Sequence, residues 1–284
     1  MANIEDFLMP VDTKISLDQV ILSPENKEKI NIFIREIKYR EEFEKYGLSP
    51  MNRLLFYGAS GTGKTFLAKA LSNHLGFKML YVDIAKTLSD NTVAQNMADI
   101  FDVANKAKNC IIFLDECDSI TMSRYAMDYS DSAQVRRATN SLFQQLDQMS
   151  PYNTFIAATN LLYKIDPAFE RRMNLKLEFR RPQLNLKDAI KHFMLPGFKF
   201  IDDVDETTKH IVDGRAADNK KLSYYEIQGL VERAMKDAIL NGHRNVRSSA
   251  VYEALSKAMN MKLRFKTDSD PEEMFKSPVD TFNR

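Results

Sequence analysis

Short apolar runs and helical stripes alternate along most of the chain. The apolar runs occupy residues 53–57, 78–82, 110–114, 154–158 and 175–179. Between the second and third runs, apolar residues recur three and four positions apart over residues 93–104, which is the spacing of one helix face. Runs such as 110–114 are apolar throughout, as in strands that are covered on both faces. The pattern therefore predicts an α/β fold in which helices cover both faces of a parallel sheet.

The N-terminal part carries one clear helix signal. Residues 1–14 show little periodicity, and we expect a flexible arm there, with a short recruitment or inter-subunit segment as the alternative. Ser23 followed by Pro24 is a good helix start, because serine caps the first amides and proline fits the first turn. One face of the predicted helix carries Ile30, Phe33, Ile34 and Ile37.

The pair Arg181-Pro182 predicts a boundary, after which the pattern indicates only helices. The predicted helices lie around residues 189–194, 204–213, 223–240 and 248–261. The third of them opens with Ser223 and Glu226, which form a capping box. We therefore expect three parts after the arm. They are an α/β core over residues 15–182, a small all-helical subdomain over 183–265 and a disordered tail over 266–284.

Composition and charge narrow the class of protein. With 284 residues and 44% hydrophobic residues, the chain is long enough for one large domain, or a large and a small one, with a real core. Its formal net charge is +1, so it lacks the basic surplus of sequence-independent nucleic-acid binding, although a local basic patch is compatible with this value. No apolar run approaches the ~20 residues of a membrane span, and no signal-peptide pattern opens the chain.

The two cysteines and four histidines do not predict a metal cluster. Cys110 and Cys117 have no neighbouring Cys or His at ligand spacing, and we expect them to be reduced thiols of a cytoplasmic protein. The histidines are scattered along the chain, which also argues against a cluster of ligands.

A glycine-rich stretch after the first apolar run carries the strongest chemical signal. Residues 58–65 fit G-x-x-x-x-G-K-[ST], the phosphate-binding P-loop. A predicted strand precedes the motif and good helix formers follow it, so a chance match of a glycine-rich turn is disfavoured. Backbone amides are expected to hold the phosphates, with Lys64 at the β- and γ-phosphates and the Thr65 hydroxyl at Mg²⁺. The candidate phosphate-binding set is Gly58, Ala59, Ser60, Gly61, Thr62, Gly63, Lys64, Thr65 and Phe66.

Polar residues end the next strong apolar runs. Asp115 and Glu116 follow the run 110–114, and Asn160 comes just after the run 154–158. Ligands of open α/β sheets bind at the carboxyl ends of strands, so these side chains are expected beside the P-loop. We predict that Asp115 helps to hold Mg²⁺ and that Glu116 orients and polarises the attacking water. Asn160 is expected to hold the same water or to sense the γ-phosphate.

The stretch of sequence between the P-loop and Asp115 also indicates the order of the strands. A predicted strand and helix, residues 78–104, lie between the P-loop and Asp115. We therefore expect the P-loop strand and the strand before Asp115 to flank another strand rather than to pair directly.

Taken in order, these motifs resemble those of AAA+ ATPases, and specifically the AAA type with a single AAA module. Residues 58–65 resemble Walker A, residues 111–116 resemble Walker B, and residues 158–160 resemble sensor 1. Residues 165–172 resemble the arginine-finger segment, and the adjacent Arg171 and Arg172 are most similar to the katanin/spastin branch. The resemblance extends from about residue 15 to residue 261, which is nearly the whole chain.

The resemblance implies an ATP hydrolase that uses Mg²⁺ and is built from an α/β P-loop core and a helical lid. It implies that Arg171 and Arg172 act on the ATP of a neighbouring subunit, where an arginine stabilises charge on the transferring phosphoryl group. Because the site is then shared between subunits, a homo-oligomeric ring is expected, with a hexamer as its form. The resemblance also implies that the backbone of Val20 and Ile21 holds the adenine.

The chain departs from the family pattern at three places. The stretch 86–92 has no aromatic residue where relatives carry one that grips a threaded polypeptide, and Leu88 is the nearest substitute. The second pore-loop region, within residues 118–132, is polar and fits either a solvated connection or a loop that faces a central channel. Residues 223–226 read Ser-Tyr-Tyr-Glu and lack the glycine of the usual Ser-Gly-Ala-Asp, which contacts ribose or adenine.

These features predict an ATPase ring that remodels, unfolds or disassembles a protein target, which the sequence does not identify. The rival class is a nucleic-acid machine, such as a helicase loader or a clamp-loader subunit. The near-neutral charge and the arginine pair disfavour this class without excluding it. A third class is a ring that uses ATP only to assemble, and the missing pore-loop aromatic favours it.

Overall fold

The computed structural model describes residues 8–9, 14–88, 93–122, 133–181, 186–201, 222–251 and 253–254. The chain divides into two compact units, one that ends at Arg181 and one that begins at Pro182. The first unit holds the main sheet and every candidate site residue named above.

The first unit is built on a six-stranded sheet with the order β1-β3-β4-β5-β2-β6. Its main strands are β2 (Arg53–Gly58), β3 (Lys78–Val82), β4 (Cys110–Leu114), β5 (Thr154–Thr159) and β6 (Leu175–Phe179). All five pair in parallel, so the five predicted strands are confirmed. The P-loop strand β2 and the strand β4 flank another strand, as predicted, and that strand is β5.

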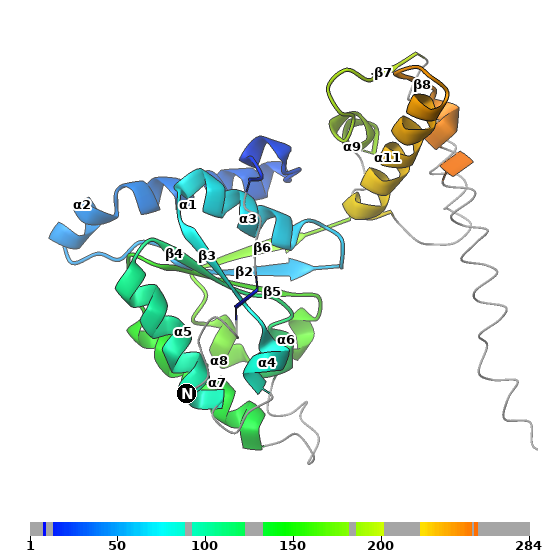
Figure 1. Cartoon of the computed structure of the whole chain (residues 1–284). Helices are drawn as coiled ribbons and strands as arrows, with labels where there is room; N and C mark the ends of the chain where they lie inside the picture. The colour runs from blue at the N-terminus through cyan, green and yellow to red at the C-terminus, as the bar shows by residue number, and fades with distance from the viewer. Residues whose placement is uncertain are drawn as a thin grey trace, which may run out of the picture. The chain divides into compact units, whose positions relative to one another are not determined.

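Helices cover both faces of this sheet (Figure 1). One face carries α1 (Pro24–Lys38) and α3 (Lys64–Leu75), and α2 (Arg40–Lys45) follows α1. The other face carries α4 (Ile84–Leu88), α5 (Val93–Ala107), α6 (Asp118–Thr121), α7 (Ala133–Gln148) and α8 (Pro167–Glu170). The predicted fold class, a parallel P-loop sheet between layers of helices, is confirmed.

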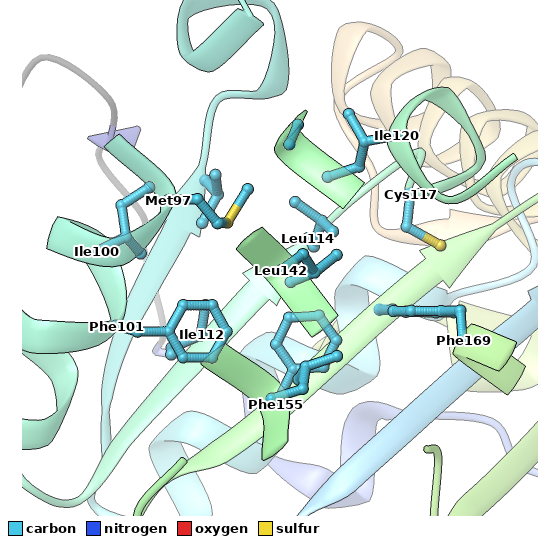
Figure 2. Close-up of a cluster of buried hydrophobic side chains, with 14 of the residues drawn as sticks. Met97, Ile100, Phe101, Ile112, Leu114, Cys117, Ile120, Leu142, Phe155 and Phe169 are labelled. Atoms are coloured by element: carbon cyan, nitrogen blue, oxygen red, sulfur yellow. The ribbon is translucent and has the colours of Figure 1, made fainter. Parts of the chain in front are cut away.

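Two hydrophobic clusters, one on each face of the sheet, hold the layers together. The first cluster includes Ile112, Leu114 and Phe155 of the sheet with Met97, Ile100, Phe101, Leu142 and Phe169 of α5, α7 and α8 (Figure 2). The second cluster includes Leu54, Phe56, Ile111, Phe113 and Ile156 of the sheet with Ile30, Phe33, Leu67 and Leu71 of α1 and α3. Successive strand residues point to opposite faces. Because both faces are buried, the strands are apolar throughout.

The predicted start of the N-terminal helix is confirmed. The hydroxyl of Ser23 accepts a hydrogen bond from the amide of Asn26, and Pro24 occupies the first helical position of α1. Ile30 and Phe33 are buried on the face that packs against the sheet. The capped helix therefore contributes one apolar stripe to the second cluster.

The expectation of a flexible arm over residues 1–14 is wrong at two positions. Leu8 and Met9 form β1 (Leu8–Met9), which pairs antiparallel with β3, the outermost of the five parallel strands on that side. An edge strand offers unpaired backbone N–H and C=O groups, and an extended segment that passes beside it satisfies them. A pairing of two residues leaves no periodicity that the sequence could show. The rest of this segment up to residue 13 lies outside the described residues.

The second unit contains helices and one short pair of strands. Two of its described helices are α9 (Leu186–His192) and α11 (Tyr224–Leu240). The predicted capping box opens α11, because Ser223 and Glu226 each accept a hydrogen bond from the other's backbone amide. The expectation of helices only is wrong, since β7 (Lys199–Phe200) pairs in parallel with β8 (Asn245–Val246). Strands of two residues are too short to show alternation in the sequence.

Several predicted features of this unit lie outside the described residues. They are the predicted second helix at 204–213, most of the predicted fourth helix and the tail at 266–284. Residues 248–251 and 253–254 are helical, where the fourth helix is expected to begin. Across the part of the chain that the structure describes, no helix combines the length and the hydropathy that a membrane span requires.

Candidate nucleotide-binding site

The P-loop joins the end of β2 to the start of α3, and the geometry requires glycine at two of its positions. Gly58 has a φ of +139°, and a Cβ there would lie 2.0 Å from the carbonyl oxygen of Phe179. Gly63 has a φ of +101° and is the N-cap of α3, where it offers no side chain to the first amides. Those amides have no partner within the helix. The loop therefore presents N–H groups and a positive dipole end, which are common receptors for phosphate.

Other residues of the P-loop stabilise its conformation. The hydroxyl of Thr62 donates to the carbonyl of Ala59 over 2.7 Å and braces the turn. Gly61 has a φ of +74°, which also favours glycine. Ser60 is exposed, and Phe66 is half-buried in the first turn of α3. All nine predicted phosphate-binding residues therefore lie in one continuous loop and helix start.

The ammonium of Lys64 lies inside this loop. It donates to the carbonyl oxygens of Gly58 over 2.7 Å and Ala59 over 2.9 Å, and to Oδ1 of Asn160 over 2.7 Å. The side chain is buried, and this burial lowers the pKa of Lys64, while the charges of two nearby aspartates oppose the shift. A buried cation that meets only neutral oxygens gains from an anionic partner, so a phosphate suits this position.

Asp115 follows β4 and accepts three hydrogen bonds. Its Oδ2 accepts from Oγ1 of Thr65 and from the hydroxyl of Tyr81, each over 2.9 Å. Its Oδ1 accepts from the amide of Glu116 over 3.0 Å. The predicted metal pair of Thr65 and Asp115 is thus in direct contact, although 50 residues separate the two in sequence. Hydroxyl and carboxylate oxygens are the hard donors that Mg²⁺ prefers, so the pair fits this ion.

Glu116 has a strained backbone next to this pair. Its φ of +49° lies in the left-handed region, which residues with a Cβ rarely adopt. The next amide, of Cys117, donates to the carbonyl of Ala158 over 2.9 Å, and the carbonyl of Glu116 accepts from both the amide and the hydroxyl of Ser119. The Glu116 side chain is exposed. Strain that the surrounding contacts enforce is typical of functional positions.

The end of β5 is tied to the turn after β4. The hydroxyl of Thr159 donates to Oδ1 of Asp118 over 2.6 Å and accepts from the amide of Leu161 over 2.9 Å. Asn160 is the next residue and makes the contact with Lys64 described above. The charge of Asp118 opposes the lowering of the pKa of Lys64, so this turn also favours the charged form of the lysine.

The two arginines of the predicted finger segment have different surroundings. Arg172 donates from Nε and Nη2 to the two oxygens of Asp147, each over 2.9 Å, and from Nη1 to the carbonyl of Ala168 over 3.0 Å. Its guanidinium carbon lies 4.6 Å from the ring centroid of Phe143. The hydrogen bonds to Asp147 raise the pKa of Arg172 and lower the pKa of Asp147. Arg171 is exposed, and its side chain makes no hydrogen bond or ion pair among the described residues, although its backbone amide donates to the carbonyl of Pro167.

The structure thus brings together four predicted site residues and leaves two apart from them. Where β2, β4 and β5 end, Lys64 is hydrogen-bonded to Asn160 and Thr65 to Asp115. Glu116 follows Asp115 directly in the sequence. Both arginines follow α8 directly, and in the described parts of the chain their side chains make no hydrogen bond or ion pair with this set. Of the two, Arg172 has a guanidinium that is already engaged, and the prediction that these arginines act on a neighbouring subunit stays a prediction.

The predicted adenine contacts lie before α1. Val20 follows the short 3₁₀ helix η2 (Leu17–Gln19) and packs against the second cluster, which includes α3. Val20 and Ile21 are both half-buried. The position of Val20 against this cluster is compatible with the predicted role.

The pore-loop predictions fall mostly outside the described residues. Leu88 is the last residue of α4, and residues 89–92 of the first pore-loop stretch lie beyond the described part. The same holds for residues 123–132 of the second stretch. In the described part of the chain, no group of three or more His, Cys, Asp or Glu side chains could hold a metal ion.

Tyr81, Asp118 and Asp147 contact the predicted site residues, and sequence reasoning did not select them. Asp118 lies three positions after Asp115, at the start of a polar stretch, which was an available signal. Tyr81 is the penultimate residue of a predicted strand, and that position is informative only when the order of the strands is known. Burial and the charge of Asp115 raise the pKa of Tyr81, so its phenol remains a hydrogen-bond donor. For Asp147 the sequence offered no signal.

Comparisons with known proteins agree with this geometry. Residues 54–181 match the model of the AAA family, described as the ATPase family associated with various cellular activities. An uncharacterized AAA family ATPase, y4kL, of Sinorhizobium fredii is 27% identical over 88% of this chain and 73% of its own length. A proteasome-activating nucleotidase of Saccharolobus solfataricus is 29% identical over 80% of this chain and 57% of its own length. A 26S proteasome regulatory subunit 6B homolog of Encephalitozoon cuniculi is 28% identical over 76% of this chain and 56% of its own length.

The chain therefore spans between 56% and 73% of the length of these three relatives. None of the three is named a katanin or a spastin, so the branch suggested by the arginine pair stays a prediction. The matched model covers the P-loop, Asp115, Glu116, Asn160 and both arginines. Residues 54–181 therefore match the AAA ATPase domain in sequence as well as in sheet topology, and these matches support ATPase activity.

Proposed function

We propose that the protein hydrolyses ATP with Mg²⁺ as part of an oligomeric ring and uses this reaction to remodel, unfold or disassemble a protein target. The observation that carries the proposal is the contact between the two halves of the site. Lys64 and Thr65 of the P-loop meet Asn160 and Asp115, which follow two other strands. A cation, a metal-binding pair and a polar amide at one edge of a sheet suit phosphoryl transfer.

The P-loop binds the triphosphate of ATP. The ammonium of Lys64 exchanges its neutral oxygen partners for the β- and γ-phosphates, and the amides at the start of α3 add further donors. The hydroxyl of Thr65 and the carboxylate of Asp115 hold Mg²⁺, which when bound neutralises charge on the phosphates. The backbone of Val20 and Ile21 contacts the adenine.

Glu116 and Asn160 act on the attacking water. The exposed carboxylate of Glu116, directly after Asp115, accepts a proton from the water that attacks the γ-phosphorus. The strained backbone at Glu116 fixes the direction in which its side chain leaves the chain, and this supports a base that is held in position. The amide of Asn160, which Lys64 releases when the triphosphate binds, orients the same water or contacts the γ-phosphate.

Arg171 acts on the ATP of a neighbouring subunit. Its exposure and the absence of a side-chain hydrogen bond or ion pair among the described residues support this role. Such an arginine is worth ~10³–10⁵ in rate in related chemistry. Arg172 belongs to the same segment and steadies it, because its guanidinium is bonded to Asp147 and Ala168. A site completed by a neighbour requires a homo-oligomeric ring, for which a hexamer is the expected form.

The target of the ring is proposed to be a protein. The names of two relatives refer to the proteasome, which favours a protein target over nucleic acid. The near-neutral net charge of +1 points in the same direction. The alternative of a ring that uses ATP only to assemble is favoured by the absence of an aromatic residue from the stretch 86–92.

The test measures phosphate release by the purified protein alone, with a permanently unfolded polypeptide and with single-stranded DNA. We expect Mg²⁺-dependent turnover that the polypeptide stimulates and the DNA does not. Stimulation by DNA would instead favour a helicase-loader or clamp-loader role, and turnover that responds to neither would favour the ATP-assembled ring. Absence of any Mg²⁺-dependent turnover would overturn the proposal. The Glu116→Gln variant, which should retain ATP, then serves to capture the target in a pull-down.

A further inference from the structure

Tyr81 belongs to none of the motifs of the site, yet its hydroxyl contacts the carboxylate of Asp115. The phenol oxygen lies 2.9 Å from Oδ2 of Asp115, the same atom that Oγ1 of Thr65 reaches over 2.9 Å. The other oxygen, Oδ1, accepts from the amide of Glu116. The carboxylate is therefore held by donors from three parts of the chain, namely α3, β3 and its own turn.

The order of the strands explains how Tyr81 reaches this position. β3 and β4 pair in parallel with Tyr81 opposite Phe113. Paired residues share a face of the sheet and side chains alternate along a strand, so Tyr81, Phe113 and Asp115 lie on one face. The same face carries α3, because Phe113 and Leu67 of α3 belong to the second cluster and Tyr81 packs against it.

Packing fixes the direction of the phenol. The rings of Tyr81 and Phe113 meet edge to face with their centroids 5.1 Å apart. Tyr81 is half-buried, so its ring is held among apolar groups while its hydroxyl lies at the end of the strand, where the polar site begins. A rigid aromatic ring of this kind gives the hydroxyl little freedom to move away from Asp115.

We propose that Tyr81 is a positioning residue of the Mg²⁺ site and that its hydroxyl holds the Asp115 carboxylate in the orientation that serves Thr65 and the metal. This inference rests on the proposed role of Asp115 in holding Mg²⁺. A partner that bonds to a metal ligand orients it, and the loss of such a partner typically weakens metal affinity or activity by about 10–100-fold. Tyr81 acts through Asp115 and need not touch the metal or the nucleotide.

The test uses Tyr81→Phe, which removes the hydroxyl and keeps the ring that packs on Phe113. Binding of the non-hydrolysable analogue AMP-PNP is measured by calorimetry in EDTA and across a titration with MgCl₂, so that the result does not depend on turnover. The Mg²⁺ concentration that gives half of the gain in affinity should rise about tenfold in the variant. The affinity in EDTA should stay unchanged, because Tyr81 has no role toward the nucleotide itself.

A matched control is available at the opposite end of the strands. The hydroxyl of Tyr152 also donates to a carboxylate, that of Glu44, over 2.7 Å, but Tyr152 precedes β5 and lies away from the P-loop. Tyr152→Phe should therefore leave the Mg²⁺ titration as it is in the wild type. Thr65→Val is the positive control, since it removes a proposed ligand.

The outcomes separate this inference from the proposed function. A Mg²⁺ titration that Thr65→Val shifts and Tyr81→Phe does not would overturn the role of Tyr81 and leave the proposed function standing. A lower melting temperature of Tyr81→Phe with an unchanged Mg²⁺ midpoint would also overturn it, because the hydroxyl would then have only a structural role. If neither Thr65→Val nor Asp115→Asn shifts the titration, the metal site itself is wrongly assigned and the proposed function fails with it.

Discussion

The ammonium of Lys64 donates a hydrogen bond to Oδ1 of Asn160 over 2.7 Å and so joins two motifs that lie 96 residues apart in sequence. The contact runs from the loop after β2 to the end of β5, which is the neighbour of β2 in the sheet. Two carbonyl oxygens of the P-loop complete the surroundings of this buried cation. Phosphate oxygens can replace these neutral partners, so we expect Lys64 and Asn160 to separate when a triphosphate binds.

We expect Lys64→Ala to lose most of the affinity for ATP while the fold stays intact. A hydrogen bond to a charged group contributes about 1.5–3 kcal/mol, so the loss of one phosphate contact alone raises the Kd by roughly ten- to a hundredfold. Calorimetric titration with an ATP analogue measures the affinity, and circular dichroism checks the fold. Lys69→Ala, on the same helix, is the control and should bind like the wild type. Undiminished affinity of Lys64→Ala would contradict the assignment of the P-loop.

Glu116→Gln should bind ATP like the wild type and hydrolyse it about 10²–10⁴-fold more slowly, the usual contribution of a general base. Glutamine keeps the shape of the side chain and cannot accept the proton of the attacking water. Steady-state phosphate release, measured beside nucleotide binding, gives both quantities. Turnover close to that of the wild type would mean that another residue activates the water.

Glu116→Gly should be as stable as the wild type, or more stable by up to about 1 kcal/mol, although it loses hydrolysis. The reason is the φ of +49° at Glu116, which glycine adopts without strain. Glu28→Gly is the matched control, because Glu28 is exposed in the interior of α1 and glycine there should lower stability by about 1 kcal/mol. The free energy of unfolding in urea compares the two variants. Equal losses at both positions would show that the strain at Glu116 contributes nothing.

Arg171→Ala should retain ATP binding and lose hydrolysis by about 10³-fold or more. Hydrolysis should partly return when this variant is mixed with Glu116→Gln. In a mixed interface the Arg171→Ala subunit supplies an intact Glu116, and its neighbour supplies an intact Arg171. The wild type should show a specific activity that rises with protein concentration, since monomers lack the arginine of a neighbour. Constant turnover per subunit at concentrations where light scattering detects only monomer would rule out the ring.

Arg172→Ala should lower the free energy of unfolding by about 1–2 kcal/mol at neutral pH. The variant loses the two hydrogen bonds to the partly exposed Asp147, the hydrogen bond to the carbonyl of Ala168 and the contact with the ring of Phe143. Asp147→Asn should reproduce the part of this loss of stability that comes from the ion pair. Denaturation in urea measures each variant, and a stability equal to that of the wild type would show that these contacts are not formed in solution.

The same pair predicts the direction of a pH effect. Arg172 lowers the pKa of the Asp147 carboxyl in the folded protein. The contribution of the pair is therefore fully present above the ordinary pKa of an aspartate, and it is lost as the pH falls through the lowered folded value. The stability difference between the wild type and Arg172→Ala should accordingly shrink in acid and level off at the part that comes from Phe143 and the carbonyl of Ala168.

The sequence by itself determined the features that depend on neighbouring residues in the chain. The run 110–114 is apolar at every position because both faces of its strand are buried, so the strand was visible without any knowledge of its partners. The spacing of Gly58, Gly63 and Lys64 is a local requirement of a loop that turns tightly into a helix. The polar residues after the strands were equally visible in the sequence. Ligands of open α/β sheets bind at the carboxyl ends of the strands, so polar residues that directly follow a strand mark the site.

Only the tertiary structure decided the features that depend on which elements become neighbours. Tyr81 meets Asp115 because β3 lies beside β4, and no local pattern states the order of strands. The difference between Arg171 and Arg172 depends on Asp147 of α7, which bonds to the guanidinium of Arg172. The Arg171 side chain has no such hydrogen bond or ion pair among the described residues. Short pairings such as β1 with β3 follow the same rule. Their residues are too few to carry a periodic signal, so an available partner in the fold decides whether they form.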